Sequence, residues 1–350
     1  MTDDRWNIGV GVPTEDAESA RIRLLKANKL VSGKKPFRKD NLVFFPITDV
    51  MNIEKIIKNP DVIIGTYQFI SRSKKIPLDE LIKDNHPNLV KNNISLKFDQ
   101  IGELIILKLD PIKTEISSRK YIGELILRHN PKVQTVLNKI DSIEGQKRLY
   151  PIEILAGKTQ TTTWHHEYGL RIFCDVENAY FNPRLAEEHH RVGKSVFDGD
   201  LILDMFTGVG SFALHCAANS FCNIISVDIN KYAIESLKRS ISKNKLKGII
   251  NPIISDSTLF LNKKQSFNRI IINFPQNSWE YISLASKFLK KNGVITFYQF
   301  ISKDDLSEAG ISDILERKLK GLKSYKVIYH RIGREISPSR TQLNVDIQIF

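Results

Sequence analysis

The chain has 350 residues, enough for two or three domains, and its 52 lysines and arginines against 39 aspartates and glutamates give a net charge of +13. This charge favours a polyanionic partner such as nucleic acid, although a generally basic proteome would produce the same balance. The three cysteines lack metal-ligand spacing, and no apolar run approaches the roughly 20 residues that span a bilayer. The start of the sequence has no signal-peptide pattern, so we expect a cytoplasmic protein rather than a disulfide scaffold, a zinc protein or a membrane protein.

Residues 1–65 are expected to form a small α/β module. A strand over 6–12 is followed by a helix that Thr14 caps and that runs to about Leu30, and a second strand covers 41–47. Nothing catalytic is visible in this stretch, and its layout suits a binding domain.

Residues 66–178 are expected to form a second unit, of the α+β type. Ile101-Gly102 predicts a turn between two strands, and Ala156-Gly157 predicts another turn. The other elements predicted in this unit are helices over 78–82, 86–90 and 118–129, a further helical segment over 133–138, and a strand over 170–176.

From residue 179 onward, apolar runs alternate with helical patterns. The predicted strands cover residues 201–203, 223–228, 249–254, 267–273 and 293–300. The helices between them indicate a parallel sheet covered on both faces, so the fold class is α/β and Rossmann-like. Two final strands, over 324–331 and 343–350, have only a loop between them and predict an antiparallel pair at the edge of that sheet.

The first strand of this sheet leads into Asp204 and a turn that contains Gly208 and Gly210, before a helix over 211–218. The glycines allow positive φ angles and a close approach of the backbone to a ligand, and the start of the helix offers free N–H groups. The spacing also fits a loose dinucleotide fingerprint. The turn alone therefore leaves NAD, S-adenosylmethionine and an ordinary strand-to-helix connection open.

Three acids follow successive strands: Asp204, Asp228 and Asp256. Ligands of an open parallel sheet lie beyond the carboxyl ends of its strands, so this set favours a nucleoside cofactor over three unrelated turn residues. An acid just before the glycines is awkward beside the pyrophosphate of NAD, but it suits the ammonium group of S-adenosylmethionine. Asp228 would then accept hydrogen bonds from the ribose hydroxyls, and Asp256 would bind the adenine amino group.

Two more segments carry polar groups next to this sheet. Asn273-Phe274-Pro275-Gln276 is similar to the base-gripping loop of methyltransferases that modify planar nitrogens, although a polar strand end with a turn proline is the simpler interpretation. Asn182-Pro183 predicts the start of a helix, on which Arg184, Glu188 and Arg191 share one face. A salt-bridged surface helix is the alternative for that face.

Taken together, these stretches resemble the archaeal and eukaryotic tRNA (guanine-37-N1)-methyltransferases. The matching motifs, in the order of that family, are Arg148 with Glu153-Ile154-Leu155-Ala156-Gly157, His166-Glu167-Tyr168-Gly169, Asp175, Tyr180-Phe181-Asn182-Pro183-Arg184-Leu185, Asp204-Met205-Phe206-Thr207-Gly208-Val209-Gly210 and Asn273-Phe274-Pro275. The similarity extends over nearly the whole chain, so the set carries more weight than any single motif.

The resemblance implies three domains. They are an N-terminal tRNA-recognition domain over 1–65, a middle RNA-binding domain over 66–178 and a class I methyltransferase domain over 179–350. The resemblance also implies S-adenosylmethionine as the cofactor and a tRNA with guanine at position 37 as the substrate. We expect a monomer that needs neither a metal ion nor a membrane.

Residue roles follow from the same resemblance. Glu188 matches a general base that takes the proton of guanine N1, Arg148 matches an arginine at guanine O6, and Asn273 matches an asparagine that holds the base. The residues assigned to the cofactor are Asp204, Phe206, Gly208, Gly210, Asp228, Ile229, Asp256, Asn273 and Pro275. The residues assigned to tRNA are Arg184, His189, Arg191 and Arg340.

The sequence departs from the family pattern at a few of these positions. Asn182 stands where serine is usual, His189 where arginine is frequent, and Phe274 where leucine is usual. The alternatives that stay open are methylation of a tricyclic wyosine precursor at the same tRNA position, transfer of the aminocarboxypropyl group of the same cofactor, tRNA binding without catalysis, and NAD-dependent oxidoreduction. The Asn182-Pro183-Arg184 run favours methyl transfer over aminocarboxypropyl transfer.

Overall fold

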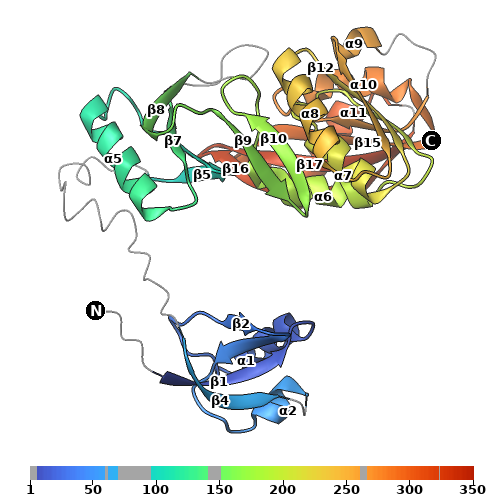
Figure 1. The fold of residues 1–350 in the computed structure, drawn as a ribbon. Helices are drawn as coiled ribbons and strands as arrows, with labels where there is room; N and C mark the ends of the chain where they lie inside the picture. Colours follow the sequence, from blue (N-terminus) through green and yellow to red (C-terminus); the bar gives the residue numbers. More distant parts are fainter. Residues whose placement is uncertain (1–5, 60–61, 70–95, 141–150, 261–265, 323) are drawn as a thin grey trace. The chain divides into compact units, whose positions relative to one another are not determined.

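A computed structural model describes residues 6–59, 62–69, 96–140, 151–260, 266–322 and 324–350. The chain divides into two compact units, residues 1–81 and 82–350 (Figure 1). The predicted helices over 78–82 and 86–90 lie outside the described residues, and the predicted domain boundary at residue 178 stays a prediction. No helix in the described part is long and apolar enough to cross a membrane.

In the described residues up to Phe69, the N-terminal unit is a four-stranded antiparallel sheet with two helices. The strands β1 (Trp6–Pro13), β2 (Phe37–Lys39), β3 (Leu42–Pro46) and β4 (Ile63–Gln68) lie in the order β2-β3-β1-β4, and the helices are α1 (Ala17–Lys26) and α2 (Ile53–Ile57). Its core joins Val10 and Val12 of the sheet to Leu24 of α1 and Ile53 of α2. The predicted strands are confirmed.

The predicted start and end of α1 are wrong. The Thr14 hydroxyl donates to the carbonyl of Asn41 at 2.9 Å, so it fastens the loop before β3 instead of capping the helix. The helix begins at Ala17 and ends at Lys26, four residues before Leu30.

The second unit opens with a four-stranded sheet in the order β5-β6-β7-β8, beside the helix α5 (Ile116–His129). Its strands are β5 (Phe98–Ile101), β6 (Leu104–Leu107), β7 (Thr135–Lys139) and β8 (Ile152–Gly157). The helical segment predicted over 133–138 is wrong, because this stretch forms β7. Val136 and Leu137 are fully buried next to β6, and a short buried apolar run of this kind has no periodicity that separates a strand from a helix.

A hairpin and a seven-stranded sheet complete this unit. The hairpin strands β9 (Thr162–Glu167) and β10 (Leu170–Asp175) turn at Tyr168 and Gly169, which both have positive φ. The sheet strands are β11 (Leu201–Asp204), β12 (Asn223–Asp228), β13 (Ile249–Ile254), β14 (Phe267–Ile272), β15 (Leu289–Ser302), β16 (Tyr325–Ser337) and β17 (Arg340–Ile349), in the order β13-β12-β11-β14-β15-β17-β16. The first five in that order are parallel, as predicted, and β17 and β16 add the predicted antiparallel pair.

Helices cover both faces of the seven-stranded sheet. The helical elements of this part are η1 (Pro183–Leu185), α6 (Ala186–Lys194), α7 (Ser211–Asn219), α8 (Lys231–Lys243), α9 (Ser257–Phe260), α10 (Ser278–Ser286), η2 (Lys303–Asp305) and α11 (Glu308–Leu319). One core cluster joins the sheet to α6, α7 and α8, and another joins it to α10 and α11. The strand order reverses between β11 and β14, and the crevice at such a switch point is where open α/β sheets bind ligands.

Gly157→Ala and Gly169→Ala test how tightly the hairpins are packed. Both glycines have positive φ, +90 and +85, so each alanine brings the strain of that backbone region, about 1–2 kcal/mol. Only at Gly157 would the new Cβ meet another backbone group, the carbonyl oxygen of Gln134 at 2.1 Å. We expect Gly157→Ala to lower the free energy of unfolding by about 1–3 kcal/mol more than Gly169→Ala in urea titrations. Equal losses would contradict a rigid contact between β7 and β8.

Candidate active site

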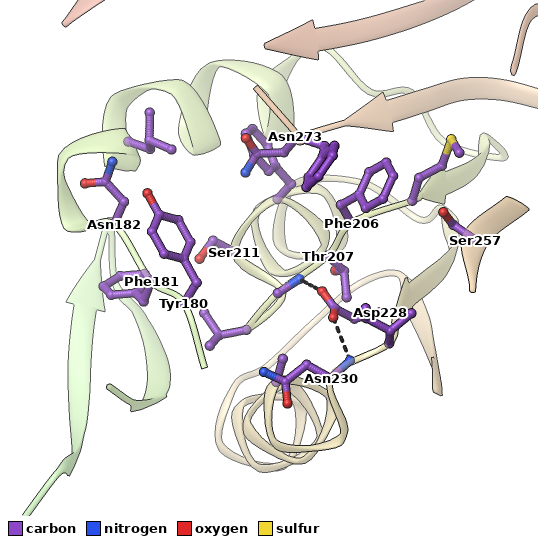
Figure 2. Close-up of a pocket in the computed structure, with 18 of the residues that line it drawn as sticks. Tyr180, Phe181, Asn182, Phe206, Thr207, Ser211, Asp228, Asn230, Ser257 and Asn273 are labelled. Atoms are coloured by element: carbon purple, nitrogen blue, oxygen red, sulfur yellow. Dashed lines mark hydrogen bonds between the residues drawn. The ribbon is translucent and has the colours of Figure 1, made fainter. Parts of the chain in front are cut away.

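A cavity of about 190 Å³ lies at the carboxyl ends of β11, β12 and β14, and we call it the first cavity (Figure 2). Its walls also include the segment 180–185 and the start of α7. Of the residues that the sequence assigned to a cofactor, those that line the first cavity are Phe206, Gly208, Asp228, Ile229, Asp256 and Asn273. Asp204, Gly210 and Pro275 are not among its lining residues.

The two glycines of the turn after β11 have different tasks. Gly208 lines the first cavity with φ +53, and its N–H donates to Oδ2 of Asp228 at 2.8 Å. Gly210, with φ +83, faces the interior, where a Cβ would lie 2.2 Å from the side chain of Leu237 on α8. Gly208 therefore shapes the cavity wall, whereas Gly210 allows α7 and α8 to pack closely.

Asp228 ends β12 with its carboxylate held by the backbone. Oδ2 accepts from the N–H of Gly208, and Oδ1 accepts from the N–H of Asn230 at 2.9 Å (Figure 2). Burial raises the pKa of Asp228, while these two hydrogen bonds oppose the rise. The remaining lone pairs of both oxygens can accept hydrogen bonds from a diol.

Asp204 is fully buried and does not touch the first cavity. Its Oδ2 accepts a hydrogen bond from the Thr207 hydroxyl at 2.8 Å, and its Oδ1 has no hydrogen-bond partner in the part of the chain that the structure describes. Burial raises the pKa of Asp204 to about 7, and the charge of Asp228 adds to this effect. The sequence suggested that Asp204 serves the ammonium group of the cofactor. Because Asp204 does not line the first cavity, its carboxylate has no direct access to a ligand there.

Aromatic side chains form one wall of the first cavity. Phe206 stacks on Phe274 with ring centroids 5.0 Å apart, and Tyr281 meets Phe206 edge-on at 4.9 Å. Asp256 lies at the same end and accepts hydrogen bonds from the backbone and hydroxyl of Thr258 at 2.8 and 2.7 Å. A flat, apolar ring system with a polar edge fits this end of the cavity.

A second cavity, of about 520 Å³, shares Tyr180, Phe181, Asn182 and Leu185 with the first. Its other walls carry charged side chains: Asp99, Lys139, Arg184, Glu187, Glu188, Arg331 and Glu335. Arg184 forms an ion pair with Asp99 here, and Arg331 pairs with Glu187 at 3.0 Å. The common wall brings the two cavities next to each other.

Glu188 lies on α6 at the second cavity, with only 5% of its surface exposed. Its Oε1 accepts hydrogen bonds from Nε and Nη2 of Arg191, at 2.9 and 2.6 Å, and from the hydroxyl of Tyr298 at 3.1 Å. No hydrogen bond within the described residues reaches Oε2. One oxygen is therefore anchored and the other is available to a ligand.

Arg191 connects α6 to β17, one of the two antiparallel strands at the edge of the sheet. Its guanidinium pairs with Asp346 of β17 at 2.9 Å and lies 3.8 Å from the centre of the Tyr329 ring. Burial works against the charge, but the hydrogen bonds with Asp346 and Glu188 outweigh it and raise the pKa of Arg191. The tRNA contact expected of Arg191 would have to compete with these partners.

Three other residues assigned to tRNA or catalysis have separate locations. Arg340 is exposed at the start of β17, and Arg148 lies outside the described residues. His189 is 4% exposed, lines the first cavity and bonds Glu167 through Nδ1 at 2.9 Å. The roles given to these residues stay predictions.

The chain is similar to known proteins along nearly its whole length. The TRM5/TYW2 methyltransferase domain matches residues 163–328, and the TYW2 N-terminal domain matches residues 78–161. The tRNA (guanine(37)-N(1))-methyltransferase Trm5b of Methanocaldococcus jannaschii is 33% identical over 352 residues, which cover 95% of this chain and 96% of that protein. The chain belongs to the TRM5/TYW2 methyltransferase family. The resemblance seen in the sequence is thereby confirmed.

Solved structures of the TRM5/TYW2 family share the fold. The complex of aTrm5 with tRNALeu is 30% identical with a TM-score of 0.68, and the match covers 98% of this chain and 100% of that one. Methanocaldococcus jannaschii Trm5 in complex with adenosine is 29% identical with a TM-score of 0.66, over 98% of this chain and 99% of that one. The Rossmann-like α/β class expected from the sequence is confirmed.

Several residues of the site have no role assigned from the sequence. Tyr180 and Phe181 line both cavities, and their place in the family motif with Asn182-Pro183 is a signal that could have assigned them to the site. Tyr298 stands in the middle of an apolar strand, where a core tyrosine looks the same as one that donates to Glu188. Glu167 was noted within a family motif, but nothing in the sequence pairs it with His215, 48 residues away.

Asp204→Asn tests the burial of that carboxylate. The pKa of about 7 in the folded protein lies above the unfolded value of 3.8, so Asp204 destabilises the fold at pH 8; this penalty shrinks as the pH falls below 7 and is lost only below about pH 4. We expect Asp204→Asn, without cofactor, to be more stable than the wild type at pH 8, with a gain that exceeds its gain at pH 5 by about 2–3 kcal/mol. The exposed control Asp313→Asn should change neither value. The measurement is urea unfolding at both pH values, and a difference independent of pH would contradict the assignment.

Proposed function

We propose that the protein transfers the methyl group of S-adenosylmethionine to N1 of guanine 37 in tRNA. The observation that carries the proposal is the half-anchored carboxylate of Glu188 beside the wall that the two cavities share. A base placed there can act on a substrate in one cavity while a methyl donor occupies the other. The family to which the chain belongs, and the guanine-37 methyltransferase that matches it over its whole length, agree with this chemistry.

The first cavity suits the adenosine part of the cofactor. The Asp228 carboxylate can accept hydrogen bonds from both ribose hydroxyls, because its backbone partners already fix its orientation. The aromatic wall of Phe206 and Phe274, with Asp256 at its edge, suits the adenine ring and its amino group. A related Trm5 that has been solved with adenosine supports this assignment.

The second cavity suits the target base and the nucleotides next to it. A guanine inside a stacked anticodon loop cannot reach the methyl donor, so it must be flipped out of the loop. The Arg184 and Arg331 side chains at this cavity offer cations to phosphates, and the charge of +13 adds long-range attraction for tRNA. We propose that the protein acts as a monomer, since one chain supplies the walls of both cavities. We also propose that it acts in the cytoplasm.

The chemistry requires a base and a way to hold it. Guanine N1–H is a weak acid, and its nitrogen becomes nucleophilic as the proton leaves. In this proposal Oε2 of Glu188 takes that proton, while Arg191 and Tyr298 keep the carboxylate in place through Oε1. The bound cofactor supplies a methyl group on a sulfonium, which N1 attacks as the carbon–sulfur bond breaks. Asn273, at the first cavity, would hold the edge of the base, and Arg148 would stabilise the charge that develops on O6.

A radiolabel assay tests the substrate. The protein is incubated with labelled S-adenosylmethionine and with tRNA transcripts that differ only in having guanine or adenine at position 37. We expect label in the guanine transcript and N1-methylguanosine as the product nucleoside. Equal labelling of both transcripts would contradict guanine 37 as the target. A tRNA that carries a tricyclic wyosine precursor at this position, used as a third substrate, would show whether the same site accepts larger bases.

Glu188→Gln tests the general base. The amide keeps the size of the side chain but cannot take up a proton, so we expect the single-turnover rate to fall by roughly 10²–10⁴-fold. Affinity for S-adenosylmethionine, measured by equilibrium dialysis, should stay within a few-fold of the wild type. The control Glu235→Gln makes the same change at an exposed residue of α8 that pairs only with Lys238 among the described residues, and should leave the rate unchanged. A normal rate in Glu188→Gln would remove this residue from the mechanism.

A further inference from the structure

A buried carboxylate stands behind the first cavity with imidazole rings on several sides. Glu167, at the end of β9, is 2% exposed, and its Oε2 accepts hydrogen bonds from Nδ1 of His189 at 2.9 Å and from Nε2 of His215 at 3.2 Å. His165 brings Nε2 to within 3.8 Å of Oε1. The functions proposed for the two cavities do not involve the Glu167 carboxylate.

The hydrogen bonds indicate which ring nitrogens of His165, His189 and His215 carry a proton. The N–H of Gly102 donates to Nδ1 of His165 at 3.3 Å, so that ring carries its proton on Nε2, the atom that faces Glu167. His189 and His215 likewise donate to the same carboxylate. The ligating atoms of Glu167, His189 and His215 also lie within 4.8 Å of one another, as a metal site requires. The separations of 2.9 and 3.2 Å are nevertheless those of hydrogen bonds between rings and carboxylate, and we assign them so.

The carboxylate of Glu167 is an ionised group inside the protein. Burial alone would raise its pKa, but the hydrogen bonds from His189 and His215 outweigh burial and lower the pKa to about 2, so the carboxylate is ionised. A buried anion without a counter-charge is costly, and a proton on one imidazole removes that cost. His215 is 1% exposed, whereas His189 borders the first cavity, so His189 is the ring where a positive charge can also meet a ligand.

His189 is the residue of the first cavity that is suited to bind an anionic group. Among the described residues that line the first cavity, it is the one side chain that can carry a positive charge, and Asp228 and Asp256 there are acids. Its Nδ1 is engaged by Glu167, which leaves Nε2 for a ligand. Ser211 and Phe212, at the start of α7, line the same cavity, and the free N–H groups of a helix start add positive potential.

We propose that His189 binds the α-carboxylate of the methionine part of S-adenosylmethionine through Nε2–H, with Glu167 as the positioning residue behind it. The proposal rests on the proposed function, because it takes the first cavity to be the cofactor site. Asp228 and Asp256 would repel a carboxylate, so the carboxylate of the ligand is expected next to the lining residues that attract it, His189 and the start of α7. It gives His189 a different partner from the tRNA contact that the family resemblance implied.

Three ligands separate this role from a structural one. S-adenosylmethionine carries the carboxylate, decarboxylated S-adenosylmethionine lacks it, and 5′-methylthioadenosine lacks the whole amino-acid group. Their dissociation constants are measured by calorimetry on the wild type and on His189→Asn, whose amide nitrogen takes the place of Nδ1 and can still donate to Glu167, but which has neither a charge nor an Nε2–H group for the ligand. Affinity for 5′-methylthioadenosine also reports whether the cavity is intact in the variant.

We expect the wild type to bind S-adenosylmethionine more tightly than the decarboxylated compound, and His189→Asn to lose this preference. The variant should bind S-adenosylmethionine about 10–100-fold more weakly, the range for a charge-assisted hydrogen bond, and 5′-methylthioadenosine as the wild type does. An equal loss for all three ligands would show a structural role, and an unchanged affinity for S-adenosylmethionine would place its carboxylate elsewhere. Either result overturns the proposal.

Two further outcomes separate this inference from the proposed function. A wild type that binds none of the three ligands would overturn the proposed function itself. A wild type that binds them as expected but does not methylate guanine 37 would leave the assignment of His189 intact. A stoichiometric transition metal in the purified protein, found by elemental analysis and lost in His215→Gln, would replace the hydrogen-bonded cluster and overturn the inference.

Discussion

The ion network of Arg191 is the interaction on which the site depends. One guanidinium joins Glu188 of α6 to Asp346 of β17, which is also within 3.5 Å of Arg269 from β14. Because α6 follows the segment that separates the two cavities, this network fixes the common wall relative to the sheet. Removing one member of a buried network leaves the others without a counter-charge, at a cost of about 3–5 kcal/mol. The same residues therefore serve stability and the placement of the proposed base.

Two acids that are buried to a similar extent differ in pKa because their hydrogen-bond partners and neighbouring charges differ. Glu167 and Asp204 are both almost inaccessible, but the two imidazole donors of Glu167 outweigh its burial and lower its pKa to about 2. For Asp204, burial and the charge of Asp228 outweigh the hydrogen bond from Thr207 and raise the pKa to about 7. One site can therefore hold a permanently ionised carboxylate and one that protonates near neutral pH. The two carboxylates differ because different residues lie within hydrogen-bond distance of each.

Local patterns in the sequence were sufficient for the sheet and the glycine turn, and insufficient for contacts between distant segments. Buried strands such as β11 and β12 have distinctive apolar runs bounded by turns. In contrast, β7 has only the apolar pair Val136 and Leu137, which does not distinguish a strand from the helical segment that the sequence predicts there. In the site, residues next to a motif could be found, as with Asp228 and Asn273 at strand ends. The bond from Arg191 to Asp346 spans 155 residues, and that from Tyr298 to Glu188 spans 110. Only the fold brings such pairs together.

The distribution of positive charge follows the two ligands that the protein has to distinguish. The excess of basic residues is of use for a polyanion, which gains from many exposed cations and tolerates their mobility. A zwitterionic amino-acid group needs the opposite, because one buried cation in a fixed orientation can bind its carboxylate, whereas several would repel its ammonium. An arginine or lysine brought into the first cavity would keep its charge in every state, while an imidazole gains its charge through the carboxylate behind it. The Glu167–His189 pair thus places one imidazole, oriented by the carboxylate behind it, in a first cavity whose other charged lining residues are the acids Asp228 and Asp256.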